Sequence, residues 1–278
     1  MKTKQNTNPI FLFLIVLISI FVAEISAMFL LHIATSFSMY VNGLIDASLL
    51  IILVAPSLYF FSLRPLILDI AVQKEFMKEL QQSYEKLQRT QQGTISAMAQ
   101  LTEMKDPYSK GRRKHVSQLS TAIARELRLS ERQTEGIRGA GLLFDIGKIA
   151  ISPEILFKPD TMNVYEYNIF KTYPQIGYGI LNDIEFPWPI ALTVLQHQER
   201  LNGSGYPAGM KGEEIILEAR IIAVAEVVEL MICPQLHRPA LGVDKALEKI
   251  SKDRGTLYDE KVVDACIKLF KEDGFKFE

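Results

Sequence analysis

The chain has 278 residues, enough for one large domain or for a smaller domain with appendages. Its formal net charge of −1 argues against general binding to nucleic acid polymers, which requires a strongly basic face. The two cysteines lack the spacing of a metal motif or a disulfide framework, so they indicate ordinary thiols in a reducing compartment. The presence of only four histidines argues against a metal centre with many histidine ligands.

Two apolar runs open the chain. Residues 10–32 are almost continuously apolar, a length that can cross a bilayer, and a second apolar run covers residues 44–63. Basic residues precede the first run and follow the second, whereas the connector 34–43 carries no Lys or Arg. By the positive-inside rule, residues 1–65 are predicted to form a membrane anchor of two transmembrane helices with both termini in the cytoplasm. Such a chain would be a multi-pass protein of a bacterial inner membrane.

A cleaved signal peptide is the alternative for the first run, because Ile25-Ser26-Ala27 weakly resembles a cleavage site. We favour the anchor, since the apolar stretch is longer than the hydrophobic region of a usual signal peptide and a second span follows it.

Residues 66–100 are predicted to form a helical stalk. Apolar residues recur along it in heptad steps, at Ile70, Met77, Tyr84 and Met98 and at Leu80, Leu87 and Leu101. This pattern predicts a parallel two-stranded coiled coil and therefore a homodimer, with a weak centre around Gly93. A single long helix that packs on the following domain is the alternative.

Residues 101–278 show a succession of amphipathic helices and no alternation of strands with helices, which predicts an all-α bundle. Ser130 with Gln133, and Asn163 with Glu166, have the spacing of capping boxes that open helices. Further helices are predicted at 215–231, 243–253 and 260–271.

Several motifs in this domain occur in the order of one known family. Residues 203–207 read Gly-Ser-Gly-Tyr-Pro, and residues 143–148 read Leu-Phe-Asp-Ile-Gly-Lys. Four further segments resemble motifs of the same family, at 106–111, 151–159, 219–226 and 255–259. From about Leu101 to Phe270 the chain is therefore similar to the HD-GYP family of metal-dependent cyclic-di-GMP phosphodiesterases. The resemblance implies an HD-GYP helical bundle.

In that family, iron or manganese ions activate a water molecule that attacks a phosphodiester. The resemblance leaves ligand-type residues at Asp145, His197 and Glu226. Family ligands have been replaced at four positions, Arg112, Phe144, Tyr173 and Gln198. Phenylalanine offers no lone pair and arginine has no acceptor, so these replacements remove metal-binding capacity. We expect no bound cofactor; iron or manganese at the residual positions is the alternative.

The resemblance leaves two readings of Arg112. Its guanidinium either takes the metal's place beside Asp145 or Glu226, or turns to solvent and leaves the site empty. His115 lies one turn further along and is a possible replacement ligand, but we favour a surface or partner contact. For His197 we favour a hydrogen-bonded core residue over a metal ligand.

The resemblance also implies binding residues. Contacts to a cyclic dinucleotide are expected at Lys148, Tyr206 and Arg238, whereas Gln235 replaces a basic residue of the family. The family's loop is linked to partners such as diguanylate-cyclase-type domains, which suggests partner binding through Gly203, Gly205, Tyr206 and Pro207. The structural alternative is a tight turn, which two glycines and a proline form by themselves.

Together these features predict a membrane-anchored, catalytically inactive HD-GYP protein in cyclic-di-GMP-type signalling. It would act as a nucleotide sensor or as a protein-interaction module, with Asp145 and Lys148 as vestigial catalytic residues. The alternative is a weakly active metal-dependent phosphodiesterase.

Overall fold

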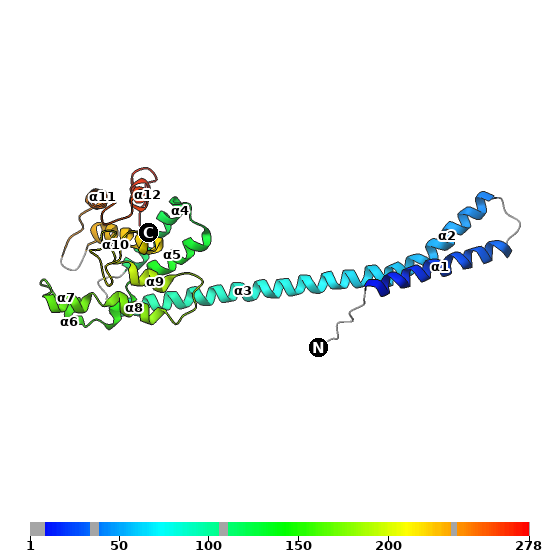
Figure 1. The fold of residues 1–278 in the computed structure, drawn as a ribbon, viewed down its shortest axis with the longest axis horizontal. Coiled ribbons are helices and arrows are strands. Elements are labelled where there is room, and N and C mark those ends of the chain that lie inside the picture. Colours follow the sequence, from blue (N-terminus) through cyan, green and yellow to red (C-terminus); the bar gives the residue numbers. More distant parts are fainter. Residues whose placement is uncertain (1–8, 34–38, 106–110, 235–237, 278) are drawn as a thin grey trace. The chain divides into compact units, whose positions relative to one another are not determined.

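The computed structural model describes residues 9–33, 39–105, 111–234 and 238–277 (Figure 1). The motif residues 106–110, together with Gln235 and His237, lie outside the described residues. The chain divides into two compact units, 1–87 and 88–278, and each is described by itself. Within the described ranges the secondary structure is helical, apart from two isolated β-bridges. The predicted all-α class is confirmed.

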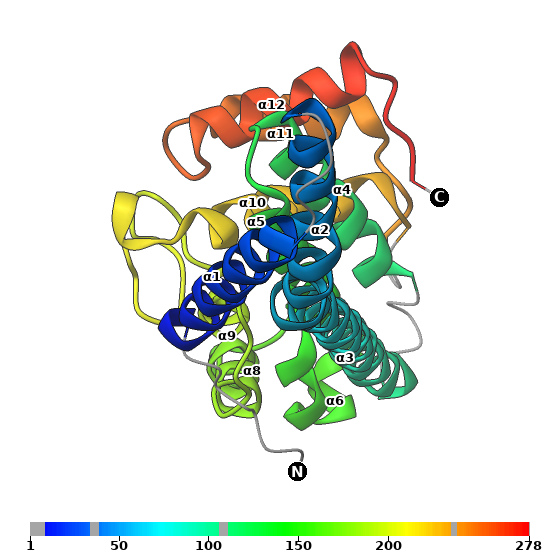
Figure 2. The same cartoon turned by 90° about the vertical axis from the view of Figure 1, so that its right-hand side faces the viewer.

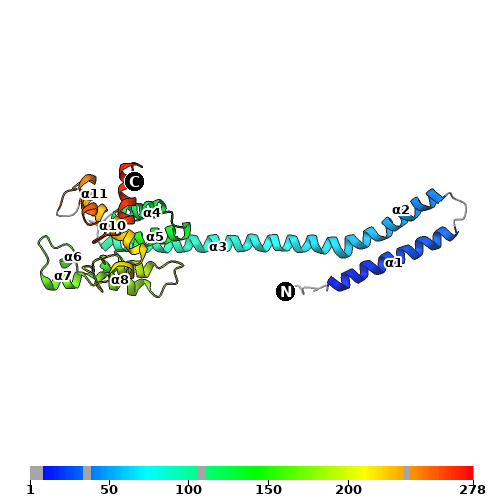
Figure 3. The ribbon, with the colours of Figure 1, turned by 45° about the horizontal axis from the view of Figure 1, so that its top comes forward.

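The first unit contains a hairpin of α1 (Pro9–Ile33) and α2 (Met39–Leu58), which lie side by side (Figure 3). Small residues make their contact: Ala23 and Ala27 are buried, and the Ser57 hydroxyl donates to the Ser19 hydroxyl over 3.0 Å. Most other described side chains of the hairpin are apolar and exposed. Two helical stretches, with apolar windows in Phe13–Leu30 and Gly43–Lys105, are long and apolar enough to cross a membrane. By this test, α1 fits an anchor and a signal sequence alike.

A π-helical turn, η1 (Tyr59–Leu63), connects α2 to the long helix α3 (Arg64–Lys105). It follows Pro56, whose ring removes one backbone donor and crowds the preceding turn, so the helical register shifts locally. In the part of α3 that belongs to the first unit, the predicted seam residues are exposed, namely Ile70, Met77, Leu80, Tyr84 and Leu87.

The end of α3 belongs to the second unit and packs on it through another face. Ile95, Ala99 and Thr102 are buried there, whereas Leu101, a predicted seam residue, is 58% exposed. These last turns therefore pack on the bundle through one face and leave Leu101 exposed on another. Packing against the bundle, rather than the regular heptad, decides the buried face at this end.

The second unit continues with α4 (Arg112–Glu126), α5 (Glu131–Leu143), η3 (Ile146–Ala150), α6 (Pro153–Leu156), α7 (Val164–Phe170), α8 (Tyr173–Leu181), α9 (Ile190–Gln196), η4 (Gly212–Glu214), α10 (Leu217–Ile232), α11 (Val243–Lys252) and α12 (Glu260–Lys271). Helix α10 lies in the middle of this unit, with α11 and α12 on one side and α8 and α9 on the other (Figures 1 and 2). Its residues from Ile221 to Ala225 are all buried, which is why its sequence is apolar on every face.

Local signals in the sequence set several helix ends. Ser130 and Gln133 form the predicted capping box of α5, and Asn163 and Glu166 form that of α7. Asp259 caps α12 by accepting from the backbone N–H groups of Lys261 and Val262.

Two glycines let the elements that carry the site approach closely. A Cβ on Gly141 of α5 would lie 2.7 Å from the Cα of Ser117 in α4. A Cβ on Gly147 of η3 would lie 1.9 Å from the carbonyl oxygen of Tyr173 at the start of α8. Only glycine fits at these crossings, and they bring the first residue of α4, the α5–η3 junction and the first residue of α8 together.

Candidate site around Arg112

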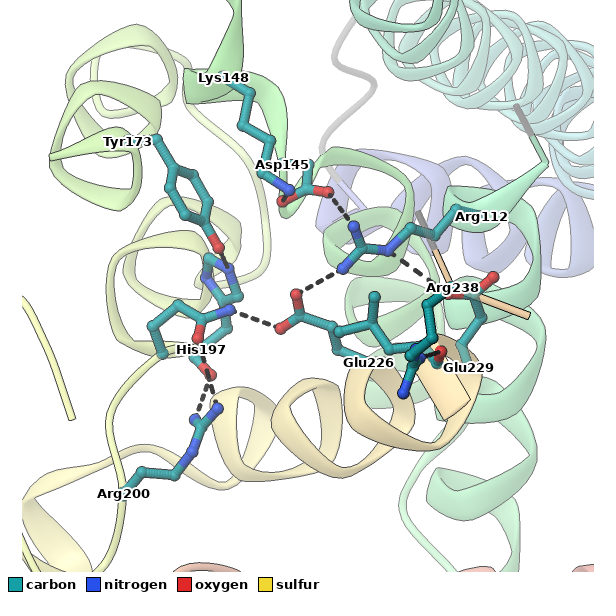
Figure 4. Close-up of polar contacts among 11 residues, drawn as sticks. Arg112, Asp145, Lys148, Tyr173, His197, Arg200, Glu226, Glu229 and Arg238 are labelled. Carbon is teal, nitrogen blue, oxygen red and sulfur yellow. Dashed lines mark hydrogen bonds and ion pairs between the residues drawn. The ribbon is translucent and has the colours of Figure 1, made fainter. Parts of the chain in front are cut away.

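Residues from five elements meet at one point (Figure 4). Arg112 opens α4, Asp145 joins α5 to η3, and Glu226 lies within the central helix α10. Tyr173 opens α8, and His197 and Gln198 follow α9. The structure thus gathers most of the positions that the sequence resemblance marked as retained or replaced metal ligands.

The Arg112 guanidinium lies among three buried carboxylates. Its Nη2 is 2.7 Å from Glu226 Oε1, its Nη1 is 3.6 Å from Asp145 Oδ2, and its Nε is 3.4 Å from Glu229 Oε2. The Arg112 side chain is only 11% exposed, so of the two readings the structure has the paired one. Burial opposes the charge on Arg112, but the three carboxylates outweigh it and raise its pKa. The guanidinium carbon also lies 5.6 Å from the centroid of the Phe144 ring.

Asp145 is held by a second cation. Lys148 Nζ lies 2.9 Å from Asp145 Oδ1, and both side chains are buried. Burial alone would raise the pKa of Asp145, but Lys148 and Arg112 lower it to about 2. Burial lowers the pKa of Lys148, with Asp145 opposing the shift. The ammonium also lies 5.0 Å from the centroid of the Tyr173 ring, so Lys148 is already engaged on two sides.

His197 is buried and bonded through both ring nitrogens. Its Nδ1 is 2.7 Å from the Val194 carbonyl oxygen. A carbonyl only accepts, so Nδ1 carries the proton, and the neutral ring accepts at Nε2 from the Tyr173 hydroxyl over 2.8 Å. Burial lowers the pKa of His197 and raises that of Tyr173 well above its ordinary value. The lone pair of Nε2, which a metal ion would need, is therefore already used by the Tyr173 hydroxyl.

Gln198 occupies the remaining oxygen of Glu226. Its Nε2 donates to Glu226 Oε2 over 2.6 Å, while Arg112 holds Oε1. Arg200 donates to the side-chain oxygen Oε1 of Gln198 over 3.3 Å, which fixes the orientation of the amide. Both oxygens of Glu226 are thus used by protein donors.

Asp145, His197 and Glu226 lie close enough to hold a metal ion, since their ligand atoms are within 4.8 Å of one another. As arranged, however, they do not fit one. Each ligand atom already faces a cation or a donor: Lys148 and Arg112 on Asp145, Arg112 and Gln198 on Glu226, and Tyr173 on His197. A metal ion would need all of these lone pairs and would be repelled by the guanidinium between them.

The Gly-Tyr-Pro loop lies beside this group and is fixed by Glu199. The buried Glu199 carboxylate accepts three backbone N–H groups, from Ala208 (2.7 Å), Gly209 (3.1 Å) and Met210 (3.0 Å). A Cβ on Gly205 would lie 2.4 Å from the Cα of Glu199, so the loop packs directly on this segment. Sequence reasoning missed Glu199; the signal that could have found it is a glutamate just before a glycine-rich turn.

The remaining predicted loop and ligand-binding residues lie as follows. Gly203 has a φ of +81°, in the region that favours glycine, and the Tyr206–Pro207 peptide bond is cis. The ring of Tyr206 lies 6.5 Å from that of Tyr173, and burial raises the pKa of Tyr206. Arg238 donates to the carbonyl oxygen of Leu230 in α10.

His115 does not join Asp145, His197 and Glu226. Its ring stacks on Phe277, with centroids 4.6 Å apart. Its Nδ1 lies 3.6 Å from Glu229 Oε1 and 3.5 Å from Cys233 Sγ. These three residues form a separate group, called the His115 cluster below. Glu229, which links this cluster to Arg112, was also missed from the sequence.

Known proteins show where this domain belongs. A family model described as HD domain matches residues 96–262. The cyclic di-GMP phosphodiesterase response regulator RpfG of Xanthomonas campestris pv. campestris is 36% identical over 188 residues, which are 67% of this chain and 50% of that protein. A cyclic di-GMP phosphodiesterase of Thermotoga maritima is 36% identical over 183 residues, 64% of this chain and 49% of that protein. The chain thus spans about half the length of these curated relatives.

A solved structure shares the fold. The cyclic GMP-AMP specific phosphodiesterase of V. cholerae superimposes with a TM-score of 0.52 at 20% sequence identity, over 64% of this chain and 48% of that chain. The family match covers more than half of the chain, and the two curated relatives named above are cyclic di-GMP phosphodiesterases. The chain therefore belongs to the HD-domain family, in its HD-GYP branch.

Proposed function

We propose that this chain is a catalytically inactive HD-GYP protein, a membrane-anchored module that binds a signalling partner and does not hydrolyse cyclic dinucleotides. The observation that carries the proposal is the position of Arg112. Its guanidinium stands between Asp145 and Glu226, where the family resemblance places the metal centre.

The chemistry supports this reading. Metal-dependent hydrolysis needs an ion that lowers the pKa of a bound water and neutralises charge on the phosphoryl oxygens. A guanidinium supplies positive charge but has no coordination site for water, so it cannot generate a bound hydroxide. Arg112 therefore neutralises the carboxylates and stabilises the fold. It cannot generate the hydroxide that would attack the phosphodiester.

The loop at 203–207 is the surface that we assign to the partner. The Glu199 carboxylate accepts from the three backbone N–H groups that directly follow the loop, at 208–210. These protein contacts hold the loop in place without a metal ion. Ser204 and Pro207 are exposed on it. Lys148, by contrast, is buried and paired with Asp145, which disfavours a phosphate contact there. A protein of the diguanylate-cyclase type is the partner that the family resemblance suggests.

A cyclic-di-GMP sensor is the second candidate function. It is favoured by the names of the curated relatives, which are cyclic di-GMP phosphodiesterases. Tyr206 and Arg238 would be its ligand contacts, with Lys148 released from Asp145. The third candidate, a weak phosphodiesterase with iron or manganese, would use Asp145, His197 and Glu226 after Arg112 had turned away.

The proposal includes the anchor and the stalk. The hairpin α1–α2 would hold the chain in a bacterial inner membrane, with both termini and the second unit in the cytoplasm, and support comes from its apolar, exposed surface. The exposed heptad residues of α3 before Gln88 would pair with a second copy of the chain.

The test compares the full chain in detergent with a variant in which Arg112, Phe144, Tyr173 and Gln198 are all changed to His. Both are produced with added iron and manganese, and metal content, cyclic-di-GMP binding and cyclic-di-GMP turnover are measured. We expect no turnover by the natural chain and a gain of bound metal by the variant.

Each outcome separates the candidates. Turnover by the natural chain that is abolished by Asp145→Ala would contradict the proposal and support the phosphodiesterase. Nucleotide binding without turnover would identify the sensor. Absence of both would favour the protein-interaction module.

A further inference from the structure

His115 and Cys233 have no part in the proposed function, and Glu229 enters it only as one of the carboxylates that pair with Arg112. His115 lies near the start of α4, Glu229 lies in the last turn of α10, and Cys233 follows α10 directly. Glu229 and Cys233 are four residues apart, so they project from one side of the helix end toward α4, which packs against α10. Their ligand atoms all lie within 4.8 Å of one another.

Two of the three separations match those around a tetrahedral zinc ion, and the third lies within 4.8 Å. Zinc bonds of about 2.0–2.3 Å to N, O and S place neighbouring ligand atoms about 3.3–3.7 Å apart. His115 Nδ1 lies 3.5 Å from Cys233 Sγ and 3.6 Å from Glu229 Oε1. We propose that His115, Glu229 and Cys233 bind a zinc-type divalent transition metal ion, at a site that neighbours the group around Arg112 and shares Glu229 with it.

The ligand set is selective. A thiolate, an imidazole and a carboxylate suit zinc or cobalt, whereas magnesium and calcium prefer oxygen ligands alone. The thiolate and the carboxylate together neutralise the double charge of the ion. Because a thiolate is the ligand form of cysteine, ion binding displaces the thiol proton of Cys233.

The surroundings orient two of the three ligands. Glu229 turns Oε1 toward His115, while its Oε2 is held 3.4 Å from Arg112 Nε. Phe277 stacks on the His115 ring and fixes its plane. Such outer contacts are typical of metal ligands. His115 and Cys233 are partly exposed, which leaves room for a water molecule as the fourth ligand.

The experiment titrates the full chain, reduced and in detergent, with Co²⁺ as the probe and then with Zn²⁺. Cobalt bound to a thiolate gives a charge-transfer band in the near ultraviolet. We expect one cobalt ion per chain with this band, its loss on addition of Zn²⁺, and its absence in Cys233→Ser. His115→Gln and Glu229→Gln should weaken cobalt binding by about tenfold or more, since loss of a partner that merely orients a metal ligand already has an effect of this size.

Two controls make the test specific. Cys266→Ser changes the other cysteine, which is buried in α12, and should keep the band. Asp145→Asn alters the site around Arg112 and should also keep it. The proposal is overturned by absence of the band in the natural chain, by its persistence in Cys233→Ser, or by its loss in Asp145→Asn.

Folding of each variant is checked independently. The chain has a single tryptophan, Trp188, which packs on the core of the second unit, so its fluorescence reports unfolding of this unit. If Cys233→Ser does not fold, His115→Gln and Glu229→Gln decide the question. The result does not depend on the proposed function, because the assay measures a thiolate–metal bond and not hydrolysis.

Discussion

Two neighbouring regions of the second unit have changed to different degrees. The Gly-Tyr-Pro loop keeps its family sequence and is held by Glu199 through three backbone bonds. The group around Arg112 keeps three ligand-type residues but surrounds them with protein donors. The comparison teaches that the shape of the loop and the pairing of the buried carboxylates depend on separate contacts within the protein. Substitutions in each region test which contacts hold it.

The largest effect is expected from Arg112→Glu. The change removes the cation and places a fourth carboxylate beside Asp145, Glu226 and Glu229, which are buried. Breaking a buried charge pair costs about 3–5 kcal/mol, and we expect the free energy of unfolding to fall by this amount. Denaturation followed by Trp188 fluorescence measures it. Arg132→Glu, at an exposed position in α5, is the control and should change little.

Gly205→Ala probes the loop region. The new Cβ would lie 2.4 Å from Glu199 Cα and 2.5 Å from Arg200 N, and these backbone atoms cannot move aside easily. We expect a loss of about 1–3 kcal/mol, as for overpacking of a core. The matched control is Gly179→Ala in α8, where a Cβ meets nothing within 4 Å. This change should raise the free energy of unfolding by about 0.5–1 kcal/mol, because alanine favours the helix more than glycine does. Equal effects of the two changes would show that the loop is not packed as described.

Tyr173→Phe removes the hydroxyl that His197 Nε2 accepts from. A buried nitrogen left without a donor costs about 1–3 kcal/mol, and because only one bond is lost we expect the lower end. The ring packing remains, so Tyr173→Phe should destabilise without changing the fold. If it leaves stability unaltered, the hydroxyl does not cap this nitrogen.

The smallest effect concerns pH. Burial lowers the pKa of His197 in the folded chain below the unfolded value of about 6.5. The unfolded state then binds more protons below that pH, so this contribution to stability is present above pH 6.5 and is lost as the pH falls. We expect stability to decline from about pH 7 to pH 5, with a shallower slope in His197→Gln. An unchanged slope in that variant would contradict a neutral, buried His197.

The sequence predicted the features that depend on neighbours along the chain. Both capping boxes, the central helix at 217–232 and the two closing helices follow from local patterns of apolar and capping residues. The family motifs marked most residues of the site, because each motif is contiguous in sequence.

The partners within the site could not be predicted in the same way. Arg112 meets Glu226 and Glu229 across more than a hundred residues, and only the packing of α4 on α10 selects them. The pairing of Tyr173 with His197 likewise depends on how α8 meets α9. The face that α3 buries at its end, at Ile95, Ala99 and Thr102, likewise depends on packing against the bundle.

The central claim is that Arg112, and not a metal ion, neutralises Asp145 and Glu226. The most direct measurement is the iron and manganese content of the full chain, produced with both metals added and with Cys233→Ser to disable the His115 cluster. We predict no stoichiometric iron or manganese. One or more ions per chain, lost again in Asp145→Ala, would contradict the account.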